Sequence, residues 1–277
     1  MCGIVGYIGA KGAYPILMDG LKKLEYRGYD SAGVAILCPA GLQIEKAQGE
    51  ISVLEVRLGG NFPAGSIGIG HTRWATHGAP SDINAHPHYG CSREFAVVHN
   101  GIIENYLGLR HWLQEEGHRF SSETDTEVLV HLVEHYYEGD LLEAVLQAVR
   151  KVEGSFAVVA ICARERDKLV CARKDSPLVI GLGEGENYIA SDVPAFLKRT
   201  RRTYILEDGE LAVVTASDVR VFSGNGHPIR KEVNEITWDA GEAEKGGYPH
   251  FMIKEIIEQP RALRDTMRGR LSDGGRD

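Results

Sequence analysis

The chain has 277 residues, of which 43% are hydrophobic and 25% are charged, as expected of a globular protein with one large or two small domains. This composition excludes a disordered or collagen-like chain. With 31 basic and 39 acidic residues, the net charge of -8 gives no overall positive field for nucleic acid or an anionic membrane. We therefore expect neither as a partner.

Neither a membrane span nor a targeting signal is visible in the sequence. No run approaches the roughly 18 apolar residues of a membrane helix, and the start MCGIVG lacks the basic region and longer apolar core of a signal peptide. The 5 cysteines are scattered without a C-x-x-C pair, which argues against a disulfide scaffold or a zinc ribbon. The sequence predicts a cytoplasmic protein.

Short runs rich in β-branched residues predict strands along most of the chain. They cover 4–8, 33–37, 67–70, 95–99, 156–161, 169–172, 188–190, 204–206, 211–214 and 219–222. Apolar residues at helical spacing predict helices near 16–24, 106–113, 128–133 and 141–149, the third of them capped by Ser122 or Thr124. Because the strands come in runs, an α+β fold with antiparallel sheets is favoured over a doubly wound parallel sheet.

The composition changes near residue 240. Residues 239–247 read DAGEAEKGG, and residues 250–271 have the pattern of one or two amphipathic helices without a partner strand. We predict that 2–240 form the functional domain. Residues 241–277 are then a connector toward a further part of a longer protein.

Cys2 is the most informative single residue. Removal of Met1 leaves this thiol beside its own α-amine, so that one residue holds both a nucleophile and a base. A cysteine before an apolar strand can equally be a small buried core residue. Cys2 alone does not decide between the two interpretations.

Three further segments carry polar groups at strand or helix ends. Residues 24–33 (LEYRGYDSAG) run through a glycine turn into a strand, and 71–78 (HTRWATHG) end a strand with a cation and an indole. Asn100 and Gly101 end another strand and supply a side-chain amide and a backbone N–H, the two donors that an oxyanion hole requires. Alone, each segment is equally compatible with a tight turn or a surface ion pair.

Together and in this order, CGIVG, LEYRGYDSAG, HTRWATHG, NAHPH, VVHNGIIEN and ETDTEV resemble the glutaminase domain of the glucosamine-6-phosphate synthase family. The resemblance covers about residues 2–270. It implies a class II glutamine amidotransferase with the N-terminal nucleophile hydrolase fold, which has four αββα layers with two stacked antiparallel sheets. The implied reaction hydrolyses L-glutamine to glutamate and ammonia without a cofactor, and the ammonia serves glucosamine 6-phosphate synthesis from fructose 6-phosphate.

The resemblance also implies sugar-phosphate isomerase domains, through which the full-length enzyme forms a homodimer. Nothing in the present sequence corresponds to them. We therefore expect this polypeptide to hydrolyse glutamine without forming glucosamine 6-phosphate, and without stimulation by fructose 6-phosphate.

The implied catalytic residues are Cys2, Asn100 and Gly101. Cys2 attacks the side-chain amide carbon of glutamine, and its α-amine passes a proton to the departing ammonia. Asn100 and the backbone of Gly101 bind the oxyanion, each donor contributing on the order of 3 kcal/mol.

The implied substrate-binding residues match the charges of a zwitterionic amino acid. Arg73 binds the substrate carboxylate, for which a guanidinium fork is well suited, and Asp125 receives the α-ammonium group. The resemblance further places Thr76 and His77 beside Arg73, Arg27 on the loop that closes over the nucleophile, and Trp74 as the indole that shields the site and gates ammonia.

Other interpretations remain open at this stage. The domain could serve another class II amidotransferase, such as amidophosphoribosyltransferase, or bind glutamine without catalysis. His131, Glu134 and His135 match the H-x-x-E-H zinc pattern, but no third acidic ligand follows, and we expect an ordinary amphipathic helix with an exposed polar edge and no metal.

Overall fold

The computed structural model describes residues 2–59, 64–237, 247–248 and 251–267. The helices are α1 (Ala13–Leu24), α2 (Ile51–Leu58), α3 (Tyr106–Glu115), α4 (Glu127–His135), α5 (Leu141–Lys151) and α6 (Phe251–Met267), with 3-10 helices η1 (Glu25–Arg27) and η2 (Val193–Ala195).

The strands form two sheets. The first has the order β15 (Asn234–Glu235), β11 (Arg202–Ile205), β9 (Val179–Leu182), β10 (Glu186–Ala190), β1 (Gly3–Gly9), β4 (Ile67–Arg73), β2 (Ser31–Cys38), β3 (Gly41–Gln48). The second has the order β14 (Pro228–Ile229), β13 (Val219–Phe222), β12 (Leu211–Val214), β8 (Glu165–Lys174), β7 (Gly154–Cys162), β6 (Phe95–Ile103), β5 (His88–Tyr89). Neighbouring strands are antiparallel throughout both sheets.

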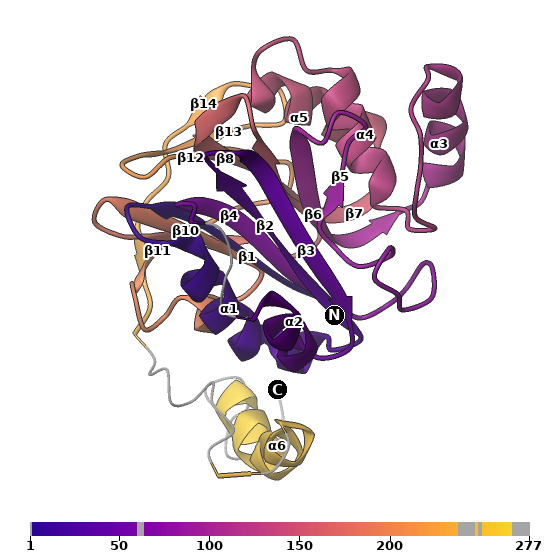
Figure 1. Ribbon diagram of the computed structural model, residues 1–277. Coiled ribbons are helices and arrows are strands. Elements are labelled where there is room, and N and C mark those ends of the chain that lie inside the picture. The colour runs from indigo at the N-terminus through magenta and orange to yellow at the C-terminus, as the bar shows by residue number, and fades with distance from the viewer. Residues whose placement is uncertain (1, 60–63, 238–246, 249–250, 268–277) are drawn as a thin grey trace, which may run out of the picture. The chain divides into compact units, whose positions relative to one another are not determined.

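Strand alternation creates a core on each face of each sheet. On β1, Ile4 and Ile8 pack toward the second sheet, whereas Val5 and Tyr7 pack under α1. On β7, the even-numbered positions from Phe156 face α4 and α5, and the odd-numbered ones face the first sheet. The result is the layer order helix, sheet, sheet, helix, which confirms the predicted α+β fold with two stacked antiparallel sheets (Figure 1).

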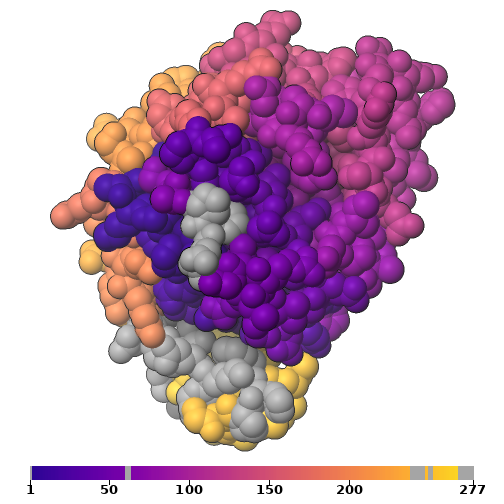
Figure 2. Space-filling model, viewed as in Figure 1, coloured from indigo at the N-terminus to yellow at the C-terminus, as the bar shows by residue number. Residues whose placement is uncertain are grey.

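The elements of the two sheets come from distant parts of the chain. Figure 2 shows one face, on which the indigo and violet segments of the first hundred residues border the magenta and pink segments of residues 100–150. The four predicted helices and all the predicted strands overlap observed elements, although the strand predicted at 204–206 extends one residue beyond β11. The structure adds α2, β3, β5, β9, β14 and β15.

The predicted cap of α4 was wrong. The helix begins at Glu127, and its N-cap is Thr126, whose side chain makes no capping hydrogen bond. The Thr124 hydroxyl lies 3.0 Å from His88 Nε2 instead, and the Thr126 hydroxyl lies 2.9 Å from His99 Nδ1. These two hydroxyls contact buried histidine nitrogens and therefore do not cap the helix.

Contacts divide the chain into the units Met1–Ile236 and Thr237–Asp277. The predicted boundary at 240 lies outside the described residues, and the connector role of 241–277 stays a prediction. Within that part, α6 confirms one of the predicted helices and contains Pro260. Among the described residues, no helix has the length and apolar character needed to span a membrane.

Candidate active site

A pocket of about 300 Å³ opens at the end of the first sheet where it meets the second, a volume within the range of small-molecule sites. Its lining includes most of the predicted site residues: Cys2, Arg27, Arg73, Trp74, Thr76, Asn100, Gly101 and Asp125. These side chains are separated by up to 123 positions in the sequence, and the strand registers bring them together. Gly3 pairs with Thr72, and Ser31 pairs with Arg73, so the segments at 2, 30 and 74 meet at one strand end.

The Cys2 thiol is half-buried beside Trp74. The Trp74 backbone N–H donates to Cys2 Sγ over 3.2 Å. Burial raises the pKa of the Cys2 thiol above its ordinary value, whereas this N–H and the nearby Arg73 act in the opposite direction. A base is therefore needed to generate the thiolate near neutral pH.

The residues around Cys2 are held by a loop from the end of η1. The Asp30 side chain accepts a hydrogen bond from the Ala75 N–H, and the Asp30 N–H donates to the Arg73 carbonyl over 3.1 Å. A Cβ on Gly28 would lie 2.6 Å from the backbone carbon of Arg73, so the loop can press against this strand end only with glycine there.

Asn100 comes from β6 of the second sheet and points at Cys2. Its Nδ2 donates to the Cys2 carbonyl over 3.0 Å. His71 Nε2 lies 3.0 Å from Asn100 Oδ1 and 3.1 Å from the His99 carbonyl, two atoms that can only accept. Nε2 therefore carries the proton, and this bond fixes the Asn100 amide with its N–H groups toward Cys2.

His71 is uncharged in this position. It is fully buried, and burial lowers its pKa to about 3 despite the hydrogen bonds to Asn100 and His99. A neutral imidazole with a proton on Nε2 is the form that can orient Asn100.

Gly101 adopts a backbone conformation that requires glycine. Its φ is +133°, and a Cβ at this position would lie 2.0 Å from the Ser155 carbonyl oxygen. The backbone at 101 consequently lies open to the pocket, next to Asn100.

Arg73 is buried with one half of its guanidinium group engaged. Nη2 donates to the His77 and Gly78 carbonyls, the latter over 3.0 Å. Nη1 is buried and has no hydrogen-bond partner among the described residues. Burial lowers the pKa of Arg73, while Asp30, Cys2 and Asp125 raise it, and a bound carboxylate would add a further negative charge.

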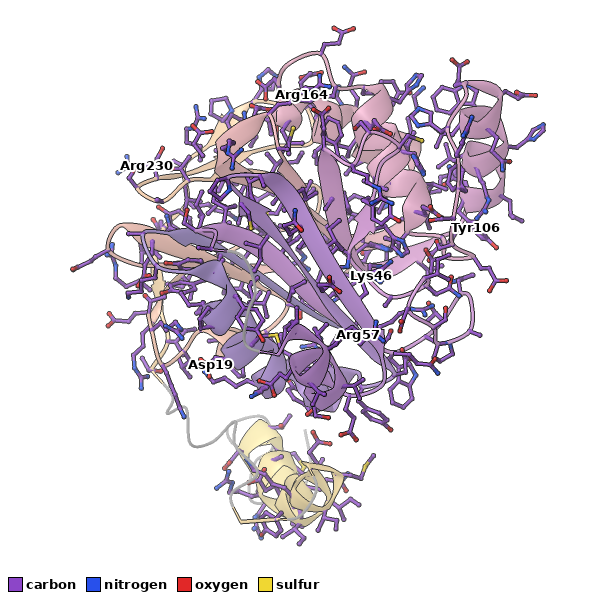
Figure 3. The ribbon with its side chains drawn as sticks, in the orientation of Figure 1. Asp19, Lys46, Arg57, Tyr106, Arg164 and Arg230 are labelled. Atoms are coloured by element: carbon purple, nitrogen blue, oxygen red, sulfur yellow. The ribbon has the colours of Figure 1, made fainter. Side chains whose placement is uncertain are left out.

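Asp125 supplies a buried carboxylate to the same pocket. Its Oδ2 accepts from the Ile103 N–H over 2.8 Å, and its Oδ1 lies 3.9 Å from His77 Nδ1. His77 does not line the pocket, and its ring packs edge-on against Tyr106, which Figure 3 labels at the start of α3. The pocket thus contains a fixed cation at Arg73 and a fixed anion at Asp125.

The remaining predicted residues border the pocket. Arg27 Nη1 forms an ion pair with Asp192 Oδ2 at 2.8 Å, so the predicted closing loop is held by η2 in this structure. Trp74 is 49% exposed and packs edge-on against Tyr29, with ring centroids 5.3 Å apart. Thr76 is exposed at the same rim.

Residues 71–198 match the family described as glutamine amidotransferase domain. An isomerizing glutamine–fructose-6-phosphate aminotransferase of Clostridium tetani is 57% identical over 274 residues, which make up 99% of this chain and 45% of that relative. Residues 71–198 therefore belong to the glutamine amidotransferase domain family. The enzyme of the same name from Thermus thermophilus is 53% identical over 273 residues. The chain thus spans less than half the length of these curated relatives.

Solved structures of amidotransferases share the fold. The glutamine phosphoribosylpyrophosphate amidotransferase of B. subtilis superimposes with a TM-score of 0.69 at 26% identity, over 80% of this chain and 49% of that one. A glutamine aminotransferase class-II domain protein of Silicibacter pomeroyi has a TM-score of 0.54 at 14% identity, which supports the fold alone.

Several parts of this amidotransferase site were missed from sequence. Ser155, Ser176 and Pro177 line the pocket from the second sheet and the following loop, and no local pattern marks them. In the sequence, His71 stood out only as the first residue of the segment HTRWATHG, and no role could be assigned to it. Its role depends on Asn100, which lies in the other sheet.

The loop before His86 is anchored from β3 and α2. Lys46 Nζ donates to the carbonyls of Ile83 and Ala85, and Arg57 pairs with Asp82 at 2.7 Å; Figure 3 labels both basic residues. Burial lowers the pKa of Lys46 to about 8. These bonds fix His86, which lines the pocket and stacks on His71 with ring centroids 4.1 Å apart.

Proposed function

We propose that the chain hydrolyses the side-chain amide of L-glutamine through a thioester on Cys2. The observation that carries this proposal is the convergence of a half-buried thiol, an oriented amide donor and a pair of opposite fixed charges in one pocket. Glutamine is itself zwitterionic at its α-carbon and ends in a primary amide. Its charged α-groups match the fixed charges of Arg73 and Asp125, and its amide end matches the thiol of Cys2 and the amide donor of Asn100.

In this proposal, Arg73 and Asp125 hold the α-carboxylate and the α-ammonium group. The Arg73 Nη1 that lacks a partner in the described structure is the donor available to the carboxylate. The Asp125 carboxylate is buried and retains one oxygen that is not bonded to the Ile103 N–H. Binding both charges fixes the amide end of the substrate relative to Cys2.

The chemical step begins with attack of Cys2 Sγ on the amide carbon. The C–S bond forms while the carbonyl π electrons move to oxygen, and Asn100 Nδ2 with the Gly101 N–H stabilises the resulting oxyanion. The thiol proton passes through the α-amine of Cys2 to the leaving nitrogen, which departs as ammonia. Water then adds to the thioester, releases glutamate and restores the thiol.

The proposal requires that Met1 is removed, because only then is the Cys2 nitrogen a basic amine. Retention of Met1 would make this nitrogen an amide, which cannot accept the thiol proton. A preparation that retains Met1 should therefore be inactive.

We further propose that the ammonia serves an acceptor domain outside this sequence. The relatives at 53–57% identity are named for amino transfer to fructose 6-phosphate, which makes this sugar phosphate the favoured acceptor. The B. subtilis amidotransferase acts on a phosphoribosyl compound but is only 26% identical, so it is the weaker guide. Dimerisation through isomerase domains and residence in the cytoplasm belong to the same proposal.

Glutamate release from L-glutamine by the purified chain tests the hydrolytic function. We expect turnover by the methionine-free chain, none by Cys2→Ala, and turnover by the control Cys38→Ala, whose thiol is buried at the end of β2. Glutamine binding without turnover by the methionine-free chain would favour a non-catalytic binding module instead.

A further inference from the structure

Four side chains with metal-ligating atoms meet outside the active-site pocket. Cys91 follows β5, His118 follows α3, and His131 and Glu134 lie one turn apart on α4. One ligand atom from each residue lies within 4.8 Å of the other three. None of the four residues lines the active-site pocket.

The separations between these atoms suit a common centre. Cys91 Sγ lies 3.9 Å from His118 Nδ1 and 3.8 Å from His131 Nδ1. Glu134 Oε2 lies 3.5 Å from His118 Nδ1 and 3.7 Å from His131 Nδ1. Ligands bound to zinc at about 2.0–2.3 Å in a tetrahedron lie roughly 3.3–3.7 Å from each other.

The same separations are too long for direct hydrogen bonds between imidazole and carboxylate, which favour 2.7–3.2 Å. His131 and Glu134 are therefore arranged around a common position and are not directly hydrogen-bonded to each other. His131 is 1% exposed and the Glu134 side chain 12%, so both groups lose most of their water at this position. A metal ion would compensate for that loss.

Neighbouring groups orient the ligands in the manner of an outer coordination shell. The Arg119 N–H donates to Cys91 Sγ over 3.2 Å, as suits a thiolate. Glu134 accepts from the N–H groups of Cys91 and Ser92, each over 2.7 Å. The Glu127 carboxylate lies 3.7 Å from the far nitrogen of His131, Nε2, without a direct hydrogen bond to it.

We propose that Cys91, His118, His131 and Glu134 bind one Zn²⁺ ion in a closed, structural site. One thiolate, two imidazoles and one carboxylate are donors that zinc accepts, and four protein ligands leave no open position for a substrate. Cys91 is exposed, which gives the ion an entry path. The ion joins the turn after β5 and the end of α3 to α4, and Figure 1 shows α3 at the margin of the domain beside α4.

The structure differs from the sequence interpretation of H-x-x-E-H in two ways. His131 is buried rather than part of an exposed polar edge. His135 packs edge-on against Trp112 and is not part of the group, so the ligands on the helix are three rather than four positions apart. The other two come from segments that no helical spacing can reveal.

Metal content of the untagged chain tests the site. After dialysis against metal-free buffer we expect about one zinc per chain in the wild type, and less than a tenth of that in Cys91→Ser and Glu134→Gln. Loss of an outer-shell partner alone weakens metal binding about 10- to 100-fold, and loss of a ligand weakens it further. His135→Gln is the matched control on the same helix and should keep its zinc. Cys2→Ala should also keep it, which separates this site from the proposed glutaminase chemistry.

Cobalt substitution gives a second readout that does not depend on variant folding. The wild-type chain, stripped by a chelator and titrated with Co²⁺, should develop a thiolate-to-cobalt charge-transfer band that saturates at about one equivalent. The band should be absent in Cys91→Ser and present in His135→Gln. A wild-type chain that holds no zinc and shows no such band, or metal retained equally by all variants, would overturn the proposal.

Discussion

Hydrogen bonds hold the Asn100 amide at both of its ends. His71 bonds to Oδ1 and the Cys2 carbonyl accepts from Nδ2, so the proposed mechanism requires no large rotation of this amide to bring Nδ2 to the oxyanion. The rigidity comes from a neutral, buried histidine. Removing either partner should therefore affect the reaction rate more than substrate binding.

Asn100→Ala should lower kcat for glutamine hydrolysis by about 100- to 1000-fold, with a much smaller change in KM, because the lost donor acts on the oxyanion. Asn105→Ala is the control, since the Asn105 side chain bonds to Lys151 and Glu153 outside the pocket. Steady-state glutamate release measures both. A kcat above half the wild-type value in Asn100→Ala would contradict the assignment.

Arg73→Lys should raise KM for glutamine by about 10- to 100-fold, the effect of losing a charge-assisted hydrogen bond. A lysine has a single nitrogen, so it cannot occupy the position of Nη2 beside the carbonyls of His77 and Gly78 and also that of Nη1. Arg164→Lys, at an ion pair with Glu94 outside the pocket lining, should leave KM unchanged. If the KM of Arg73→Lys equals that of wild type, the substrate carboxylate binds elsewhere.

Gly101→Ala should inactivate the enzyme and destabilise the fold by more than the ~1–3 kcal/mol of backbone strain alone, because the new Cβ would clash with Ser155. Gly117→Ala separates the two effects: φ is +93° there, but no atom lies within 4 Å of the added Cβ. Urea denaturation measures the stability of the two variants, and glutamate release measures their activity. Equal stability of the two variants would refute the clash.

At the scale of elements, the segment before α4 joins the pocket to the helix. The Glu127 carboxylate accepts from the Ser122 N–H at 2.7 Å and from the Ser121 N–H at 2.8 Å, and so folds this segment back on the helix start next to Asp125. Burial acts to raise the pKa of Glu127, but His131 and these serines outweigh it and hold the pKa well below its usual range.

Glu127→Gln should lower the free energy of unfolding by about 1.5–3 kcal/mol and raise KM for glutamine, since the amide keeps one acceptor oxygen but turns its NH2 group toward one of the two serine N–H groups. Glu123→Gln, at an exposed position in the same segment, is the control and should change neither quantity. The free energy of unfolding and the KM for glutamine are both measured for each variant, by denaturation and by steady-state glutamate release. Wild-type stability in Glu127→Gln would show that this carboxylate does not hold the segment.

The helices and strands could be predicted from the sequence more completely than the contacts within the candidate site. Strands such as β1 and β7 were predictable because their alternation is local, whereas the α4 cap was not, because the Thr124 and Thr126 hydroxyls bond to histidines from other strands. The candidate nucleophile and its neighbours were found through motifs. Contacts such as His71 to Asn100 depend on how the sheets stack.

At the scale of the whole molecule, the stacking of two sheets places uncharged histidines beneath the pocket. The pKa values of four of them lie below the usual value, chiefly because of burial: His71 at about 3, and His86, His88 and His99 also lowered. In the unfolded chain each has a pKa near 6.5. Below about pH 6.5 the unfolded chain therefore binds protons that the folded one does not, and stability falls as pH decreases.

The denaturation midpoint should thus be lower at about pH 5.5 than at about pH 8. In the metal-free chain His131 opposes this trend, because Glu127 and Glu134 raise its pKa against the effect of burial. The effect of His131 on the pH dependence should be smaller than the combined effect of the four histidines whose pKa values are lowered. A midpoint that is equal or higher at the lower pH would contradict the neutral state of the buried histidines.

The most direct test of the central claim is the intact mass of the chain after incubation with a diazoketone analogue of glutamine, which alkylates an activated thiol held in a glutamine site. We predict a mass that lacks methionine and carries a single adduct, and loss of the adduct in the presence of excess glutamine. A methionine-free chain that forms no adduct would contradict the proposal that Cys2 is an activated nucleophile.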